Sequence, residues 1–438
     1  MLRLALPVIA AEIGWISMGL VDTVMVGPLG PAAIGAVGTG SILYFAVMVV
    51  GFGTIYALDT FVSQSFGAGR IDECHRWLFA GLQVAAILCV VLTGMSFALI
   101  ALLPKFHLHP DVLALIQPYM THLLWSTPLL LIYAVFRRYL QAMHVVRPIM
   151  VVLVLANLVN IGANWLLIEG HWGFPALGVV GSAYATVLSR LVIAVALFGI
   201  VVFRERDRPS GLRDVPFRWD PVRVMRIVRL GLPAAGQNLL EVGIFAMASA
   251  LAGRITPTAV AAHQVVLNIA GFIFMVPFGL ASAAAVRVGH AIGRGDGAGA
   301  QRAGWAAVLL ATVAMLMTAS VCALFPRPMI GLFTQDAGVI ELGVGLLLIA
   351  TIFQLFDGLQ AVTTGALRGL GNTQIAMFVN LVGHWALGLP IAWLLCFHYG
   401  FGAQGLWMGL AFGLIFAALI LLAVWHRHSR AIARPAGA

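Results

Sequence analysis

Long apolar stretches, separated by short polar turns, run through nearly the whole chain of 438 residues. A helix needs about 20 apolar residues to cross the hydrocarbon core of a bilayer. Charged residues make up 9% of the chain, compared with about 25% in soluble domains. The ten-residue alternating segments that are typical of outer-membrane barrels are absent. We therefore predict an all-α integral membrane protein.

The positions of the turn residues predict twelve transmembrane helices. The expected spans are 5–26, 33–64, 77–103, 111–142, 149–169, 178–203, 226–253, 258–291, 301–325, 338–368, 373–398 and 403–426. The segment 204–225 is the only long polar stretch, and Asp220 followed by Pro221 is typical of the start of a helix. We expect a short interfacial helix to lead from there into the seventh span.

Weak internal repeats divide the chain into halves. LALPVIAAE before Asp22 corresponds to LGLPAAGQN before Glu241, and GVVGSA opening the sixth span corresponds to GAQGLW opening the twelfth. Six helices are an even number, so the two halves share one orientation and form pseudo-symmetric six-helix lobes. We predict an N-terminal lobe at 1–203, a cytoplasmic linker at 204–225, a C-terminal lobe at 226–427 and a cytoplasmic tail at 428–438.

The net charge of +9 comes mainly from arginine. In a soluble protein this charge would suggest nucleic-acid binding, but here we expect no nucleic-acid partner because the arginines separate apolar spans. One side of the predicted membrane receives most of them, and the other receives few (Lys105, Arg254 and Arg327). The positive-inside rule then places both termini in the cytoplasm, with the protein in the inner membrane. The arginine-rich side comprises Arg70, Arg76, Arg137, Arg138, Arg147, the linker arginines, Arg294, Arg302, Arg368, Arg427, Arg430 and Arg434.

Three carboxylates, Asp22, Glu241 and Asp357, lie deep inside predicted spans. A charge at the centre of a transmembrane helix costs roughly 2.5–3.5 kcal/mol on insertion scales. Such a residue faces a polar cavity or a partner, so each is a candidate ion or substrate ligand. The alternative is a buried carboxyl group that only joins two helices.

Polar residues surround the two acids of the second half at helical spacing. Asp357 shares a helix face with Gln360 and Thr364, and Gln354 lies three residues before it. Gln237 and Asn238 precede Glu241 by one turn, and Asn268 lies on the eighth span. Acids and amide oxygens suit a hard monovalent cation or protons. The predicted cation-coupling residues are Glu241, Asp357, Asn268 and Gln354, although a hydrogen-bonded seam between helices would use the same residue types.

A matching polar patch is expected in the first half. Asn157, Asn160 and Asn164 form a stripe on the fifth span, and Thr186 follows on the sixth. With Asp22 these residues are expected to form a second site for protons or substrate, unless the asparagines only hold helices together. Glu12 is a fourth intramembrane acid, about 15 Å from Asp22 along the helix. Asp59 is a fifth, near the end of the second span, where we expect contact with water.

Signatures of enzymes are missing. There is no HExxH, GxSxG or P-loop pattern, the GRGDG sequence lies in a turn, and the four cysteines are scattered. We predict that the protein is not an enzyme, needs no cofactor and has no metal centre beyond a coupling ion.

Four blocks of sequence surround the intramembrane acids and the eighth span: LPVIAAEIGWISMGLVDTVMVG, LGLPAAGQNLLEVGIF, AAHQVVLNIAGFIFMVPFGLASAAAVRVGHAIGRG and FQLFDGLQAVTTGALRGLGNT. These blocks resemble multidrug and toxic compound extrusion (MATE) transporters of the NorM-like branch. The resemblance implies two six-helix lobes and export of organic cations in exchange for Na⁺ or H⁺. It places Glu241 and Asp357 in the cation site of the second lobe, with Asn268 nearby. Asp22, Asn160 and Asn164 correspond to the polar cluster of the first lobe.

Two departures from the family pattern bear on the coupling ion. Phe353 stands where some NorM-like members have tyrosine, which removes an oxygen ligand, and Glu12 stands where glutamine is common. Both changes favour H⁺, alone or beside Na⁺. We therefore predict multidrug efflux by cation-coupled antiport, with cationic or amphiphilic drugs as substrates, membrane lipid as surroundings and a monomeric chain. The alternative is a lipid-linked oligosaccharide flippase of a related superfamily, whose anionic cargo would require basic residues in its cavity.

Overall fold

The chain folds as an assembly of long helices. The computed structural model describes residues 1–106, 108–206, 212 and 214–433, and these residues contain helices and turns but no strand. Twelve helical stretches are long and apolar enough to cross a membrane, which confirms the predicted all-α class and the number of spans. They are Arg3–Leu29, Pro31–Gly67, Ile71–Phe106, Pro110–Ala142, Arg147–Glu169, Val179–Glu205, Pro221–Ala252, Pro257–Gly293, Gly297–Leu324, Ala337–Gly369, Gln374–His398 and Gly402–Ala433.

The helices form two compact units. The N-terminal unit is Ala10–Ala235, and the C-terminal unit is Met1–Ile9 together with Gly236–Ala438. The long helices α1 (Leu2–Met25) and α9 (Pro221–Ala252) are therefore each divided between the units. The predicted lobes, 1–203 and 226–427, differ from these units at both helices and stay a prediction.

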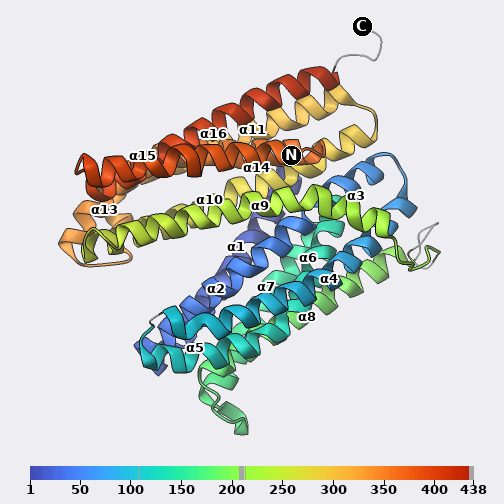
Figure 1. The fold of residues 1–438 in the computed structure, drawn as a ribbon. Coiled ribbons are helices and arrows are strands. Elements are labelled where there is room, and N and C mark those ends of the chain that lie inside the picture. Colours follow the sequence, from blue (N-terminus) through green and yellow to red (C-terminus); the bar gives the residue numbers. More distant parts are fainter. Residues whose placement is uncertain (107, 207–211, 213, 434–438) are drawn as a thin grey trace. The chain divides into compact units, whose positions relative to one another are not determined.

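The N-terminal unit is a bundle in which α7 packs on α8, α2 on α5, and α4 on α6 (Figure 1). Small residues allow this close packing: a Cβ atom added at Gly51 would meet Leu92 and Leu131 side chains at 2.8 Å. Besides parts of α1 and α9, its helices are α2 (Pro31–Ile55), α3 (Ala57–Gly67), α4 (Ile71–Leu102), α5 (Pro110–Leu123), α6 (Thr127–Ala142), α7 (Arg147–Glu169) and α8 (Val179–Glu205).

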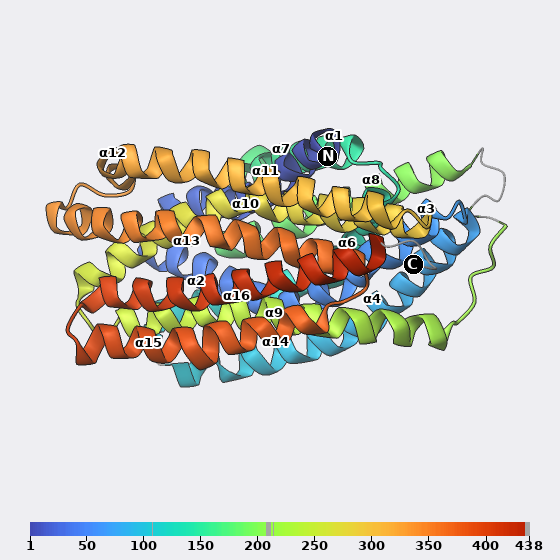
Figure 2. The same cartoon turned by 90° about the horizontal axis from the view of Figure 1, so that it is seen from above.

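The C-terminal unit is organised around α10 and α13, which lie side by side, with α11 and α16 beside them (Figures 1 and 2). Gly369 lies so close to α10 that an added Cβ would approach the Ala285 carbonyl oxygen at 2.6 Å. The described helices of this unit, beyond its part of α9, include α10 (Pro257–Gly293), α11 (Gly297–Leu324), α12 (Pro326–Gly331), α13 (Ala337–Gly369), α14 (Gln374–Asn380), α15 (Leu389–Trp393) and α16 (Gly402–Ala433).

The eleventh span departs from regular α-helix. Two π-helical stretches, Leu381–Gly388 and Leu394–His398, follow α14 and α15 within it. The sequence predicts the extent of this span but not its π-helical turns. π-helical turns are rare and occur frequently at functional sites.

The predicted linker, 204–225, is only partly visible, because residues 207–211 and 213 lie outside the described residues. Asp220 caps α9 as predicted, since its Oδ1 accepts a hydrogen bond of 2.9 Å from the Arg223 amide. The helix expected to lead into the seventh span begins at Pro221 and continues into that span without a break as α9. In the predicted tail, 428–438, α16 continues to Ala433, and residues 434–438 lie outside the described residues.

Candidate ion and substrate sites

Asp22 lies at the centre of a polar cluster inside the N-terminal unit. Its Oδ1 accepts hydrogen bonds from Asn160 Nδ2 at 3.0 Å and from Asn164 Nδ2 at 2.7 Å. Its Oδ2 accepts one from Thr186 Oγ1 at 2.7 Å. The Asp22 side chain is only 3% exposed. The sequence therefore predicts correctly that these four residues come together from α1, α7 and α8.

The cluster surrounds the Asp22 carboxylate with donors and leaves one amide oxygen unsatisfied within the described residues. Asn164 also donates to Asn160 Oδ1 at 3.2 Å, but the buried Asn164 Oδ1 has no hydrogen-bond partner. A buried acceptor without a donor is costly, and an amide oxygen beside a carboxylate is a typical ligand for a hard cation. The binding of a proton or a small cation and a hydrogen-bonded seam between helices both remain open for this cluster.

Arg190 of α8 is a basic residue near this cluster that sequence reasoning missed. Its Nη1 donates to Ser126 Oγ at 2.5 Å, and its guanidinium lies 5.2 Å from the centre of the Tyr44 ring. It acts electrostatically on Asp22 without forming an ion pair within hydrogen-bonding distance. Its position inside an apolar span, four residues after Thr186, was the available signal.

Two other predicted residues of the first half lie apart from the Asp22 carboxylate. Asn157 donates to the Gly14 and Leu153 carbonyl oxygens, both at 2.9 Å, so it joins α7 to α1. Glu12 forms a buried ion pair with Arg137, which also donates to Tyr133 Oη at 2.8 Å. The structure thus places Glu12 in a salt bridge that sequence analysis did not foresee.

A second buried ion pair corrects the expectation for Asp59. We expected water to reach this carboxylate, but its side chain is 0% exposed and lies 3.3 Å from Arg138 Nη1. Arg138 also lies with its guanidinium 4.2 Å from the centre of the Tyr56 ring. Arg137 and Arg138 are therefore buried residues of α6 and not loop arginines. Charges in apolar surroundings must be paired. The sequence around Arg137 and Arg138 does not show which acid each arginine meets.

In the C-terminal unit, Glu241 is the centre of the second cluster. Its Oε1 accepts hydrogen bonds from Gln237 Nε2 at 3.1 Å and from Gln360 Nε2 at 2.6 Å. Asp357, one turn before Gln360 on α13, interacts electrostatically with Glu241. Among the described residues, neither acid has an ion pair with a basic side chain. The site therefore holds two carboxyl groups without a basic partner among the described residues.

The other predicted coupling residues take different positions. Gln354 is 2% exposed and lies beside Cys322, and its amide atoms have no hydrogen bond to either acid within the described residues. Asn268 is exposed on α10, and no hydrogen bond joins it to either acid within the described residues. Gln360, which the structure places directly on Glu241, has an unpartnered buried Oε1. Its position on the Asp357 face of α13 was the signal for this role.

Aromatic rings and the imidazole of His263 pack together in this unit. Phe353 is 2% exposed and packs on Phe245 and Trp407, with ring centres 6.0 and 5.8 Å apart. Trp407 Nε1 donates to His263 Nδ1 at 3.1 Å, and His263 Nε2 lies 3.0 Å from Ser249 Oγ. Since tryptophan only donates, His263 Nδ1 carries no proton. His263 is therefore a neutral link between α9, α10 and α16.

The family model MatE matches residues 7–166 and 233–394. The chain belongs to the MATE family. Among the relatives, a probable multidrug resistance protein NorM of Bradyrhizobium diazoefficiens is 35% identical over 96% of this chain and 91% of the relative. The multidrug resistance protein NorM of Photobacterium profundum is 30% identical over 96% and 93%. The predicted NorM-like resemblance is confirmed.

Solved MATE structures share the fold. A eukaryotic MATE transporter matches with a TM-score of 0.87 at 22% identity, covering 99% of this chain and 97% of that one. A MOP superfamily transporter of Pyrococcus furiosus matches with a TM-score of 0.89 at 20% identity, covering 99% and 96%. MATE proteins are transporters, so family membership supports the predictions of a multi-pass membrane transporter that is not an enzyme. Within the described residues, no group of three or more metal-ligating side chains gathers.

Proposed function

We propose that this MATE protein exports cationic or amphiphilic organic compounds by antiport, in exchange for H⁺, alone or beside Na⁺. The names of its NorM relatives refer to multidrug resistance, and the intramembrane acids suit positively charged substrates. The observation that carries the proposal is the pair Glu241 and Asp357, two interacting carboxylates without a basic partner among the described residues.

A bound cation is the simplest way to compensate this pair. Two negative charges in a low-dielectric interior repel each other, and each proton or cation bound there removes part of the cost. Gln237 and Gln360 keep donating to Glu241 while it is charged. If a drug cation and a coupling ion compete for the same two carboxylates, binding of one requires release of the other. The two would then cross the membrane in opposite directions.

We assign the coupling role to Glu241 and Asp357, with Gln354 and Asn268 as further ligands. The Asp22 cluster, with Asn160, Asn164 and Thr186, binds a proton or substrate in the N-terminal unit. Phe353 offers no oxygen, which favours H⁺ over a dedicated Na⁺ cage. The driving force is adequate, because one charge moved through 100 mV contributes about 2.3 kcal/mol, equivalent to a gradient of nearly fifty-fold.

We also propose that the protein is a monomer of the inner membrane with both termini in the cytoplasm. The distribution of arginine between the two sides supports this orientation. The flippase alternative is less well supported, because the family model and the relatives lead to MATE transporters. The acids Glu241 and Asp357 are also unsuited to an anionic cargo.

Reconstitution tests the coupling ion. Proteoliposomes that contain the purified protein are loaded with ethidium. A pH gradient is then imposed in the complete absence of Na⁺, and the efflux of ethidium is followed. We expect efflux that collapses when a protonophore is added. Background efflux under the pH gradient, followed by activity after addition of an inward Na⁺ gradient, would show that the ion is Na⁺. If neither gradient drives efflux of any cationic dye, antiport of cationic drugs is wrong.

A further inference from the structure

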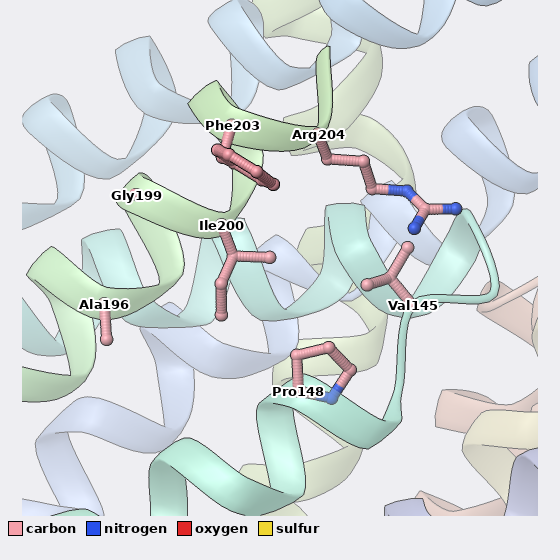
Figure 3. A pocket seen from close by; sticks show the side chains of 7 residues that line it. All are labelled: Val145, Pro148, Ala196, Gly199, Ile200, Phe203 and Arg204. Carbon is pink, nitrogen blue, oxygen red and sulfur yellow. The ribbon is translucent and has the colours of Figure 1, made fainter. Parts of the chain in front are cut away.

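An open groove lies on the surface of the N-terminal unit, between the start of α7 and the end of α8. It has a volume of about 530 Å³ and is lined by Val145, Pro148, Ala196, Gly199, Ile200, Phe203 and Arg204 (Figure 3). Phe203 is 76% exposed. None of these residues belongs to the candidate ion and substrate sites.

The groove is apolar along its length and positively charged at one end. Figure 3 shows the Arg204 side chain extended toward Val145, beyond the apolar side chains of Ile200 and Phe203. Arg147, exposed beside the lining residue Pro148, adds a second positive charge. The neighbouring acid does not cancel them, because Glu205 is 2% exposed and lies 3.5 Å from His75.

The charged end coincides with the boundary of the membrane spans. α7 begins its span at Arg147 and α8 ends its span at Glu205. From Ala196 to Arg204 the groove follows α8 for about 12 Å, at 1.5 Å per residue. The apolar part therefore lies along the spans, and Arg147 and Arg204 lie at their ends.

We propose that this groove binds an anionic phospholipid. One acyl chain lies along Ala196, Gly199 and Ile200, and the phosphate is held by Arg204 and Arg147. Charge complementarity selects this occupant: an anionic headgroup satisfies both guanidinium groups, whereas a zwitterionic headgroup brings its own cation to them. The apolar surface opens toward the layer that acyl chains fill.

The C-terminal unit has a smaller groove of about 360 Å³, lined by Trp305 of α11 and by Leu419, Leu422, Ala423, His426 and Arg427 of α16. It lies on a different pair of helices from the first groove and is not its repeat. When Gly178 is aligned with Gly402, Ala196 and Arg204 correspond to Ile420 and His428, neither of which lines the smaller groove, so the two grooves use different faces of the last helix of each unit. The proposal therefore concerns the groove between α7 and α8.

The test measures retained lipid on the full-length purified protein. Native mass spectrometry is carried out after titration with phosphatidylglycerol and, separately, phosphatidylcholine. We expect wild type to retain phosphatidylglycerol preferentially. Arg204→Gln and Arg147→Gln should each weaken this binding about fivefold, since one basic residue near an anionic surface contributes about 1 kcal/mol. Arg70→Gln, which removes an exposed arginine away from the groove, should leave binding unchanged.

A second pair of variants tests the apolar part without removing charge. Gly199→Leu fills the groove, and nothing lies within 4 Å of a Cβ atom added there, so the fold is not disturbed. Gly162→Leu is the matched control on α7, also with open space around its Cβ. Gly199→Leu should retain one phosphatidylglycerol fewer than wild type, and Gly162→Leu should equal wild type. Equal retention of phosphatidylcholine, or unchanged retention in Gly199→Leu and Arg204→Gln, would overturn the proposal.

Discussion

At the scale of single residues, four of the intramembrane acids differ in whether a basic side chain pairs with them. Glu12 and Asp59 are paired with Arg137 and Arg138, so their charges are compensated within the N-terminal unit. Glu241 accepts hydrogen bonds from the amide side chains of Gln237 and Gln360. In the described part of the chain, Asp357 has no such donor, and neither acid has a basic partner. Glu241 and Asp357, unlike Glu12 and Asp59, therefore have no basic side chain that compensates their charge within the described residues.

Neutralising either unpaired acid tests that distinction. Asp357→Asn and Glu241→Gln should each reduce coupled dye efflux to background, because the amide keeps the shape and hydrogen bonding but removes the charge. Expression level and melting temperature in detergent should stay near those of wild type. Glu341→Gln, which neutralises an exposed acid at the other end of α13, is the control and should transport normally. Wild-type efflux in both site variants would assign the pair to helix packing.

The sequence predicts the Asp22 cluster almost completely, because helical spacing aligns Asn160 with Asn164 and each intramembrane polar group needs a partner. It does not predict the pairing of Glu12 with Arg137. That pairing depends on how α1 and α6 are placed in space, and no local pattern in either helix records it. Asn157 was grouped with the site because it shares the stripe, but a shared helix face does not fix which neighbour a side chain meets.

At the scale of elements, glycine sets how closely helices approach. A Cβ atom at Gly409 of α16 would clash with the backbone of Ala392 in α15, whereas one at Gly271 of α10 would meet nothing within 4 Å. The two positions therefore differ in packing but not in the intrinsic preference of a helix for alanine.

Gly409→Ala and Gly271→Ala form a matched pair. Alanine in a helix is favoured over glycine by roughly 1 kcal/mol, so Gly271→Ala should raise the melting temperature slightly. Gly409→Ala should lower it, because backbone atoms must move to admit the methyl group and overpacking costs about 1–3 kcal/mol. Thermal unfolding in detergent measures both. Equal stabilisation by the two changes would contradict the close approach of α15 and α16.

The cap of α9 gives a pH dependence. The hydrogen bond from the Arg223 amide, with support from the Arg223 side chain, lowers the pKa of Asp220 below its ordinary value. A carboxyl group with a lowered pKa in the folded state contributes stability above its unfolded pKa of about 3.9, and this contribution is lost as pH falls through the folded pKa.

Asp220→Ala should therefore cost about 0.5–2 kcal/mol at pH 7, seen as a lower melting temperature. Asp220→Asn retains the capping oxygen and should lose less. The difference between wild type and Asp220→Asn should shrink as pH falls below about 4. A difference that stays constant from pH 7 to pH 3 would show that the Asp220 charge does not act on the helix.

At the scale of the whole molecule, hydrophobic blocks and turn residues predict all twelve spans, because the bilayer imposes length and composition on each one. They do not predict the two π-helical stretches of the eleventh span or its uneven path. Within the first stretch, Trp385 Nε1 donates a hydrogen bond of 3.1 Å to the Leu240 carbonyl oxygen of α9, a contact that the sequence of this span does not record. Apolar composition predicts that a segment spans the membrane, but it does not predict whether its turns are α-helical or π-helical.

The orientation of the chain is open to a direct test. Fusion of alkaline phosphatase to the C-terminus should be inactive and fusion of green fluorescent protein should fluoresce, because positive residues hold this end in the cytoplasm. A phosphatase fusion in the turn at Arg254 should be active, which provides the control for the opposite side. An active phosphatase at the C-terminus would reverse the proposed topology.

The division of α1 between the units has a consequence for synthesis. Met1–Ile9 belongs to the C-terminal unit, and Gly279 of α10 is so close to it that an added Cβ would lie 3.0 Å from Ile9 Cα. On the ribosome this segment emerges long before α10 is made. The N-terminal unit can gather its helices in order of translation, but the C-terminal unit needs the earliest part of the chain to meet α10, which is made much later.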